Sequence, residues 1–243
     1  MVLWGLISAL GATESLNETS RAADFLIIAD GPTIGSEKIV NASLNRIIVA
    51  LDGAADKLKT LSIQPDVILG DFDSIIDKQF WGIRYPLNES ENNPPYKGNF
   101  DVTIVPTRDQ DHTDLEKGIM YCDTQGALSI LVVNATGGRM DHSLWNIRLL
   151  KKFYNPSRSL KIQTETQILE YVQDSSTTIK GEIGDYCGIM AFPKAKVSSQ
   201  GLKYETCNYP LEFALNESVC NSLAVKSASV QIIGEALVIH PCP

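Results

Sequence analysis

Short apolar runs alternate with helical segments from the first strand-like stretch to about residue 153. The apolar runs lie at 24–29, 46–51, 67–69, 102–105 and 128–133. Helical patterns lie between or after them, at 36–44, 54–60, 75–81, 113–122 and 141–153. Such an alternation predicts βαβ units and a largely parallel sheet. We therefore expect residues 1–155 to form a Rossmann-like, three-layer α/β domain.

The pattern changes from Leu160 onward. Short strand-forming runs appear, each bounded by Gly, Pro or Asn, at Ile168–Val172, Thr177–Ile179, Tyr186–Ala191 and Ser229–Ile233. This hairpin-like spacing predicts an all-β sandwich or jelly roll. We place the boundary near residues 154–160, so that the second domain covers residues 156–243.

Two carboxylates follow directly after the apolar run Val67–Leu69, in Gly70-Asp71-Phe72-Asp73. Open α/β sheets bind ligands at the carboxyl ends of their strands. Asp71 and Asp73 would project to the same side of an extended backbone, where two like charges need a positive partner such as a hard divalent cation. The alternative is that Asp73-Ser74 caps a helix starting near Ile75.

Two further polar clusters follow later strands. Asp109–Lys117 contains Asp111 and Asp114, three residues apart, although acids in a first helical turn are also favoured by the helix dipole. In Asn134–His142, the pair Gly137-Gly138 lets backbone N–H groups approach an anion, and Arg139 supplies a fork that fits phosphate oxygens. Acids for a metal, with glycine and arginine for phosphate, predict a crevice for a nucleotide polyphosphate.

Four segments together resemble the motif set of the thiamine pyrophosphokinase family. They are Asp52-Gly53-Ala54-Ala55, Gly70-Asp71-Phe72-Asp73-Ser74-Ile75, Asp109–Lys117 and Gly137-Gly138-Arg139 with Asp141-His142. Two later segments resemble the thiamine-binding elements of the same family. They are Gly201-Leu202-Lys203-Tyr204, with Tyr204 at the usual tryptophan, and Ser218–Asn221, with Cys220 at a serine.

This resemblance implies transfer of pyrophosphate from ATP to thiamine with Mg²⁺, which gives thiamine diphosphate and AMP. The implied catalytic residues are Asp71, Asp73, Asp111 and Asp114, of which Asp71, Asp73 and Asp111 hold the metal. The residues implied for the nucleotide are Asp52, Gly53, Thr113, Lys117, Gly137, Gly138, Arg139, Asp141, His142 and Asn146. Asp52 and Asp114 are also second-rank candidates for holding the metal, contacting the substrate or accepting the alcohol proton. Thiamine is expected at Tyr204, Ser218 and Asn221. The resemblance also implies a homodimer with shared active sites.

Composition excludes other partners. A formal net charge of -8 argues against a nucleic-acid partner, since the chain has no basic stripe to neutralise phosphates. No apolar run reaches the 18 residues of a membrane span. The 5 cysteines form no C-x-x-C pair, which is typical of reduced intracellular thiols, and the apolar Met1–Ala12 lacks the basic start of a signal peptide. We expect a cytoplasmic protein.

Two other functions remain open from the residues. A strand that ends in D-x-D is also typical of metal-dependent phosphohydrolases with an aspartyl nucleophile, although Ser74-Ile75 departs from the usual next residues. A non-catalytic thiamine- or nucleotide-binding module is disfavoured by the clustered carboxylates. The loop at 85–100 is either a tolerated insertion or a lid.

Overall fold

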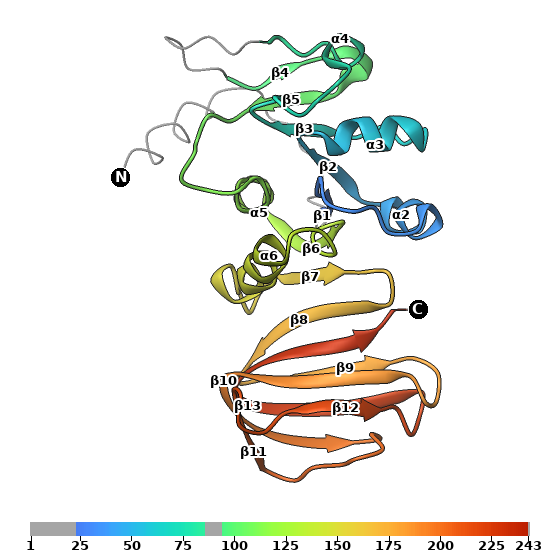
Figure 1. Cartoon of the computed structure of the whole chain (residues 1–243), viewed down its shortest axis with the longest axis vertical. Helices are drawn as coiled ribbons and strands as arrows, with labels where there is room; N and C mark the ends of the chain where they lie inside the picture. Colours follow the sequence, from blue (N-terminus) through green and yellow to red (C-terminus); the bar gives the residue numbers. More distant parts are fainter. Residues whose placement is uncertain (1–22, 86–93, 243) are drawn as a thin grey trace, which may run out of the picture.

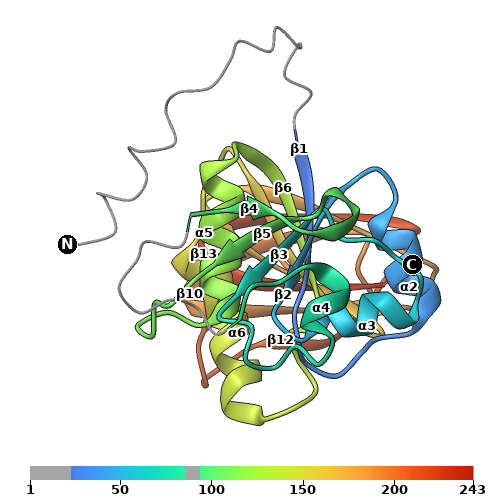
Figure 2. The ribbon, with the colours of Figure 1, turned by 90° about the horizontal axis from the view of Figure 1, so that it is seen from above.

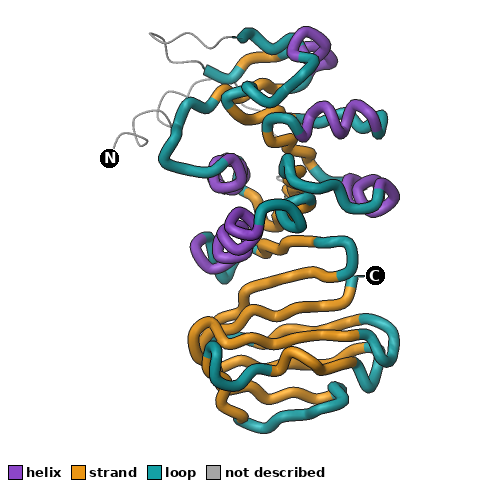
Figure 3. Tube along the Cα trace, in the orientation of Figure 1, coloured by secondary structure: helices purple, strands orange, loops and turns teal. Residues whose placement is uncertain are grey.

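The structure, a computed structural model, describes residues 23–85 and 94–242. One extended sheet runs the length of the described chain (Figure 1). Helices lie against this sheet only in its first part, and the remainder is built of strands and loops (Figure 3). The predicted order, an α/β part followed by a β-rich part, is confirmed.

Strands and helices alternate along the α/β part, and its main sheet is parallel. Strands β7, β6, β1, β2, β3 and β5 lie side by side in that order, and the short β4 pairs antiparallel with β5 at the edge. The elements are β1 (Ala23–Ile28), α2 (Ser36–Ser43), β2 (Ile47–Leu51), α3 (Ala54–Thr60), β3 (Val67–Gly70), α4 (Lys78–Trp81), β4 (Tyr96–Lys97), the 3-10 helix η2 (Asn99–Asp101), β5 (Thr103–Pro106), α5 (Asp114–Thr124), β6 (Ala127–Val133), α6 (Met140–Lys152) and β7 (Ser159–Gln163). The predicted βαβ alternation is confirmed.

Different helices cover the two faces of the parallel sheet. Helices α5 and α6 lie on one face and α2, α3 and α4 on the other, as Figure 1 shows from the side and Figure 2 from above. In β1, Phe25 and Ile27 pack into the core beneath α5 and α6, while Leu26 and Ile28 pack into the core on the opposite face. A central strand buried on both faces is a continuous apolar run, which is why the sequence shows no alternation here.

Two 15-residue strands organise the β-rich part. These strands, β10 and β13, pair with each other along most of their length, with a register shift between Ala191 and Ala195. The elements are β8 (Gln167–Gln173), β9 (Ser176–Lys180), β10 (Tyr186–Gln200), β11 (Tyr209–Glu212), β12 (Ser218–Ser222) and β13 (Ser227–Pro241). The expected runs Tyr186–Ala191 and Ser229–Ile233 are therefore sections of much longer strands.

Both long strands bend near the register shift and enclose a core. Gly234 has φ +95° there, and a Cβ at this position would lie 2.6 Å from the Lys194 carbonyl oxygen, so the bend requires glycine. Strands β12 and β8 flank one half of the pair, while β11 and β9 flank the other. Side chains from both halves, among them Val197, Val230 and Val238, form one buried cluster.

The two parts join through β7 and β8. Strand β7 pairs parallel with β6, and β8 then returns antiparallel through Lys161–Glu170, Ile162–Leu169 and Gln163–Ile168. Because β7 belongs to the parallel sheet, that sheet continues past the boundary expected at residue 155. The core beneath α6 also reaches into the β-rich part, where it includes Tyr171 and Leu237.

Some local expectations differ from the structure. The sequence predicts that Ser36 caps the helix at 36–44, but Gly35 occupies the N-cap position of α2 without a side-chain hydrogen bond. The helix expected at 75–81 begins only at Lys78, because Asp77 caps it by accepting from the Phe80 N–H at 3.1 Å. This cap overturns the alternative in which Asp73-Ser74 serves that helix.

Several expectations fall on residues outside the described ranges. These are the character of Met1–Ala12 and the middle of the 85–100 loop, residues 86–93. The end of that loop contains β4 and the start of η2. Within the described residues, every helix is too short or too polar to span a membrane.

Candidate functional site

A cleft of about 540 Å³ opens beyond the carboxyl ends of the parallel strands. Its walls come from the segments that follow β1, β3 and β6 and from the start of α5, which places it where open α/β sheets bind ligands. The predicted residues that line it are Asp71, Thr113, Asp114, Lys117, Gly138, Arg139, His142 and Asn146. The three clusters predicted from the sequence therefore meet in one crevice.

Three carboxylates lie close enough to hold one metal ion. Asp52, Asp71 and Asp73 each offer an oxygen, and these oxygens lie within 4.8 Å of one another. Asp73 and Asp71 were predicted to meet on an extended strand, but β3 ends at Gly70 and the backbone turns at Phe72, whose φ is +68°. The buried Phe72 ring anchors this turn, and the Asp73 N–H donates to Asp71 Oδ1 at 3.2 Å.

Asp52 is the buried member of this carboxylate cluster. Burial raises its pKa to about 7, against a lowering by the hydrogen bond from Ser74, whose N–H lies 3.3 Å from Asp52 Oδ2. Its Oδ1 is also buried and has no hydrogen-bond partner among the described residues. A buried, unpartnered carboxylate oxygen beside two further carboxylates is the donor set that a hard divalent cation prefers.

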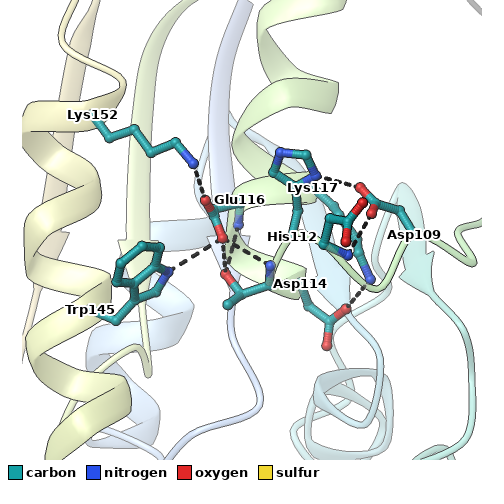
Figure 4. Close-up of polar contacts among 9 residues, drawn as sticks. Asp109, His112, Asp114, Glu116, Lys117, Trp145 and Lys152 are labelled. Carbon is teal, nitrogen blue, oxygen red and sulfur yellow. Dashed lines mark hydrogen bonds and ion pairs between the residues drawn. The ribbon is translucent and has the colours of Figure 1, made fainter. Parts of the chain in front are cut away.

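Asp111 does not belong to the carboxylate cluster within the described residues. It is exposed, and its N–H donates to Asp109 Oδ1 at 2.8 Å in the loop before α5. Asp109 in turn lies 2.5 Å from His112 Nδ1 (Figure 4). Burial would raise the pKa of Asp109, but hydrogen bonds from Asp111 and His112 outweigh it and lower that pKa.

Lys117 brings a positive charge to the cleft from the first turns of α5. Its side chain is only 9% exposed, and its Nζ lies 3.1 Å from Asp114 Oδ1. Both side chains line the cleft. A cation held in this position can meet a phosphate oxygen with little further loss of hydration, because its side chain is already largely withdrawn from water in the folded protein.

Thr113 and Glu116 form a capping box at the start of α5. The Thr113 N–H donates to Glu116 Oε2 at 2.9 Å, and the Glu116 N–H donates to Thr113 Oγ1 at 3.4 Å. The buried Glu116 carboxylate also accepts from Trp145 Nε1 at 3.3 Å and from Lys152 at 2.5 Å, both on α6 (Figure 4). The Thr113 hydroxyl is therefore shared between the cap and the cleft that it lines.

Close contacts fix the backbone of the loop between β6 and α6. Asn134 is buried with φ +60°, and its Oδ1 accepts from the Ile34 N–H at 2.9 Å. Gly31 lies against this loop, where a Cβ would come within 2.2 Å of the Asn134 carbonyl oxygen. Asn146 donates from α6 to the Ala135 carbonyl oxygen at 2.8 Å. These contacts fix the backbone ahead of the paired glycines.

Arg139 stands exposed at the mouth of the cleft. Its Nε and Nη2 donate to the two carboxylate oxygens of Asp141 at 3.1 and 2.5 Å. The hydrogen bonds from Arg139 hold the pKa of the Asp141 carboxyl at about 2. This bidentate contact with Asp141 orients the guanidinium of Arg139. His142, the residue after Asp141, also lines the cleft.

Some predicted residues do not line this cleft, and some lining residues were not predicted. Asp52 and Asp73 lie beside it in the carboxylate cluster, and Gly53 packs against Asp30, whose Oδ2 would lie 2.5 Å from a Cβ there. The other predicted residues outside the lining are Asp111, Gly137 and Asp141. The polar lining residues for which the sequence predicted no role are Asp30, Gln110, His112, Asn134, Thr136 and Ser143. Asp30 directly follows an apolar strand, and this position at a strand end is the sequence feature that could have indicated its place in the cleft.

The residues predicted for thiamine line a separate pocket of about 370 Å³ in the β-rich part. It contains Tyr204, Ser218 and Asn221, together with Tyr209 and Glu217, which the sequence reasoning missed. The Glu217 Oε2 accepts from the Ala191 N–H at 2.7 Å, while its Oε1 is buried without a hydrogen-bond partner in the described chain. A carboxylate beside two tyrosine rings suits an organic cation.

Asn221 supports the wall of this pocket through hydrogen bonds to Tyr204 and Ser218. Its side chain is buried, accepts from the Tyr204 N–H at 3.1 Å and donates to the Tyr204 carbonyl oxygen at 2.9 Å. It also donates to Ser218 Oγ at 3.2 Å. Asn221 thus holds the backbone that presents the exposed Tyr204 ring.

Two family profiles match the chain. "Thiamin pyrophosphokinase, catalytic domain" matches residues 40–162, and "Thiamin pyrophosphokinase, vitamin B1 binding domain" matches residues 176–234. The first match contains the whole carboxylate cluster, and the second contains the pocket residues Tyr204, Glu217 and Asn221.

Curated relatives carry the same name. Thiamin pyrophosphokinase 1 of Caenorhabditis elegans is 30% identical over 200 residues, which is 74% of this chain and 75% of the worm protein. Thiamine pyrophosphokinase 1 of Oryza sativa subsp. japonica is 30% identical over 71% of this chain and 64% of the rice protein. The Arabidopsis thaliana protein of that name is 29% identical over 69% and 62%. The match thus spans less than two thirds of these plant proteins.

Solved structures share the fold. Thiamine pyrophosphokinase from Bacillus subtilis superposes with a TM-score of 0.73 at 20% identity, covering 90% of this chain and 98% of the bacterial one. Thiamin pyrophosphokinase from Candida albicans gives a TM-score of 0.70 at 18% identity, with 96% and 97% covered. At these identities the likeness establishes the fold.

Proposed function

The chain belongs to the thiamin pyrophosphokinase family, and on that premise we propose that it transfers pyrophosphate from ATP to thiamine, giving thiamine diphosphate and AMP. The observation that carries the proposal is the meeting of Asp52, Asp71 and Asp73 beside a cleft lined by Lys117 and Arg139. Carboxylates for a metal and cations for phosphate at one strand-end crevice suit phosphoryl-type transfer.

We assign Mg²⁺ to Asp71 and Asp73, with Asp52 as the third ligand where the sequence suggested Asp111. The support is the geometry of the carboxylate cluster and the unpartnered Asp52 Oδ1. When bound, the ion neutralises charge on the phosphate oxygens. Asp111, on the loop before α5, keeps a role in shaping the loop that carries His112 and Thr113.

The remaining cleft residues position ATP. Lys117 and Arg139 bind phosphate oxygens, and the N–H groups around Gly137 and Gly138 cradle the same phosphates. The hydroxyethyl oxygen of thiamine attacks the β-phosphorus, the bond from that phosphorus to the α,β-bridging oxygen breaks, and AMP leaves. The alcohol proton passes to a carboxylate, for which Asp114 on the cleft wall is the candidate, since Asp52 is occupied as a metal ligand.

Thiamine itself is assigned to the pocket of Tyr204, Ser218 and Asn221. We further propose a homodimer with shared sites, supported by the separation of this pocket from the cleft within one chain and tested by sedimentation velocity. The same proposal includes a domain division at 155/156. It also includes a Rossmann-like class for the first part and a sandwich or jelly roll for the second. A cytoplasmic location, supported by the 5 free cysteines, belongs to it as well.

The test is incubation of the purified protein with thiamine, ATP and Mg²⁺, followed by separation of the nucleotides. We expect AMP and thiamine diphosphate in equal amounts. Formation of ADP or free phosphate instead would indicate a simple kinase or a phosphohydrolase. Saturable thiamine binding without turnover would indicate a binding module.

A further inference from the structure

A second cleft, of about 580 Å³, lies against the sheet face beside α2, and we call it the α2 cleft. Its walls come from α2, from the middle of β6 and β7, and from Cys242 near the end of the chain. Its polar lining includes Lys38, Arg46, Ser129, Lys161, Gln163 and Cys242. None of the described residues of this cleft lines the catalytic cleft.

The α2 cleft has a charge opposite to that of the whole protein. The chain carries a formal net charge of -8, yet Lys38, Arg46 and Lys161 line this cleft and no Asp or Glu does so in the described chain. Lys161 is neutralised by Glu170 at 2.6 Å, whereas Lys38 and Arg46 form no ion pair within the described residues. Each of the other clefts described above contains at least one carboxylate.

The hydrogen-bond donors of the α2 cleft are held in place, but they lack strong acceptors. Arg46 Nη1 donates to the Ala42 carbonyl oxygen at 2.6 Å, which anchors the guanidinium at the end of α2, while its buried Nε has no partner among the described residues. Lys38 Nζ and Gln163 Nε2 both face Cys242 Sγ, at 3.7 and 3.3 Å. A thiol is a weak acceptor, so these strong donors retain most of their capacity for a ligand.

We propose that the α2 cleft binds a small phosphate-bearing anion. Arg46 and Lys38 supply the charge, Gln163 and Ser129 supply neutral donors, and Ile168 offers an apolar wall to the body of the ligand. This assignment is independent of the catalytic cleft and does not depend on the proposed reaction.

Cys242 provides a reporter inside the α2 cleft. Cys122 and Cys187 are buried, whereas Cys207 and Cys220 are exposed, so the variant C207S/C220S leaves Cys242 as the partly exposed thiol. We would measure its rate of labelling by an anionic disulfide, dithiobis(nitrobenzoate), and by an uncharged one, dithiodipyridine, at low ionic strength without Mg²⁺. The ratio of the two rates cancels the thiolate fraction and reports the local potential.

In the C207S/C220S variant, Lys38→Gln should lower the ratio of the anionic to the uncharged labelling rate about threefold. This is the effect expected when one unit charge is removed roughly 7 Å from the negative charge of the anionic reagent in water. The matched control Lys226→Gln removes an exposed lysine that pairs with Glu182 on the β-rich part, and it should leave the ratio unchanged. A ratio that is the same in Lys38→Gln as in the parent would overturn the proposal.

Inorganic phosphate is the probe for binding itself. It should slow labelling by both reagents, more than chloride at equal ionic strength, and Lys38→Gln and Arg46→Gln should weaken this protection. Asp71→Asn should keep it, because Asp71 lies in the catalytic cleft. Absence of protection in the parent, or its loss in Asp71→Asn, would overturn the assignment. Lys38→Gln alone decides the matter if Arg46→Gln does not fold.

Discussion

At the scale of single residues, the site depends on backbone positions that the motifs do not reveal. Asp71 and Asp73 could be predicted as a pair from D-x-D after an apolar run. Their actual meeting requires the left-handed backbone of Phe72 and its buried ring. Asp52 joins them across the neighbouring strand, 19 positions earlier in the sequence and with φ +44°. From the sequence, Asp52 ranks only second among the candidate metal ligands, behind Asp111, because its approach to Asp71 and Asp73 follows from the register between β2 and β3.

The carboxylate cluster makes Mg²⁺ binding pH-dependent. Burial raises the pKa of Asp52 to about 7, so below that pH a proton occupies the cluster and Mg²⁺ must displace it. We expect Mg²⁺ at about 100 times its Kd to add roughly 2.7 kcal/mol to the free energy of unfolding at pH 8. The gain should be smaller at pH 6. Melting curves with and without Mg²⁺ at the two pH values measure it.

Asp71→Asn should lose most of this Mg²⁺ stabilisation and the catalytic activity while remaining folded. The matched control is Asp77→Asn, since asparagine still caps α4 and Asp77 lies outside the carboxylate cluster. Full Mg²⁺ stabilisation in Asp71→Asn would contradict the metal assignment.

Glu217 gives a second prediction at the residue scale. Its unpartnered Oε1 beside Tyr204 and Tyr209 should attract the positive charge of thiamine. Glu217→Gln should raise the KM for thiamine about tenfold, equivalent to about 1.4 kcal/mol, with little change in kcat. Steady-state kinetics measure this, with Glu212→Gln as control because Glu212 pairs with Lys194 elsewhere on the β-rich part. An unchanged KM would remove Glu217 from the thiamine site.

At the scale of secondary-structure elements, α5 shows which contacts can be predicted from the sequence and which cannot. The start of this helix was predicted at Thr113, and Thr113-x-x-Glu116 is a capping-box pattern. The contacts of Glu116 with Trp145 and Lys152 join α5 to α6, and no local pattern indicates them (Figure 4). The strand lengths of β10 and β13 were missed for a similar reason, since polar residues on their exposed faces interrupt the apolar runs.

We predict that Glu116→Gln destabilises the protein by about 1–3 kcal/mol, because it weakens charge-assisted hydrogen bonds in a buried position. Urea unfolding measures the difference. Lys152→Met in the same assay should cost less, since the Lys152 side chain is 46% exposed and Glu116 keeps its bonds from Thr113 and Trp145. A larger loss in Lys152→Met than in Glu116→Gln would refute this ranking.

At the scale of the whole molecule, the α/β part and the β-rich part were both predictable from the change in pattern near Leu160. The way they join was not. Strand β7 carries an apolar pattern that suits either part, and only its parallel pairing with β6 places it in the first sheet. A charged cluster consolidates this junction, where Glu170 on β8 contacts Lys161 on β7 at 2.6 Å and His240 on β13 at 3.0 Å.

The junction should be sensitive to acid. Burial would raise the pKa of Glu170, but contacts with His240, Lys161 and Thr177 outweigh it and lower the pKa to about 2. A carboxyl whose pKa is lower when folded adds stability above its unfolded pKa, about 4.5, and loses it as the pH falls toward 2. Glu170→Gln should therefore cost on the order of 3 kcal/mol at pH 7 and much less at pH 3.

Urea unfolding at the two pH values measures the acid dependence. The control Glu182→Gln alters an exposed glutamate paired with Lys226, and it should show no comparable dependence. If the cost of Glu170→Gln were the same at pH 3 as at pH 7, the charged junction would not carry the predicted stability.

The pairing of β7 with β8 has a consequence for motion. Three residue pairs cross this junction, and the core beneath α6 continues through it, so the cleft proposed for ATP and the pocket proposed for thiamine belong to one hydrogen-bonded frame. Such a frame opposes a hinge motion between its halves. If the proposed assignment of the two substrates holds, we expect them to be brought together by rearranged loops or by the matching pocket of a second molecule and not by closure of one part of the chain onto the other.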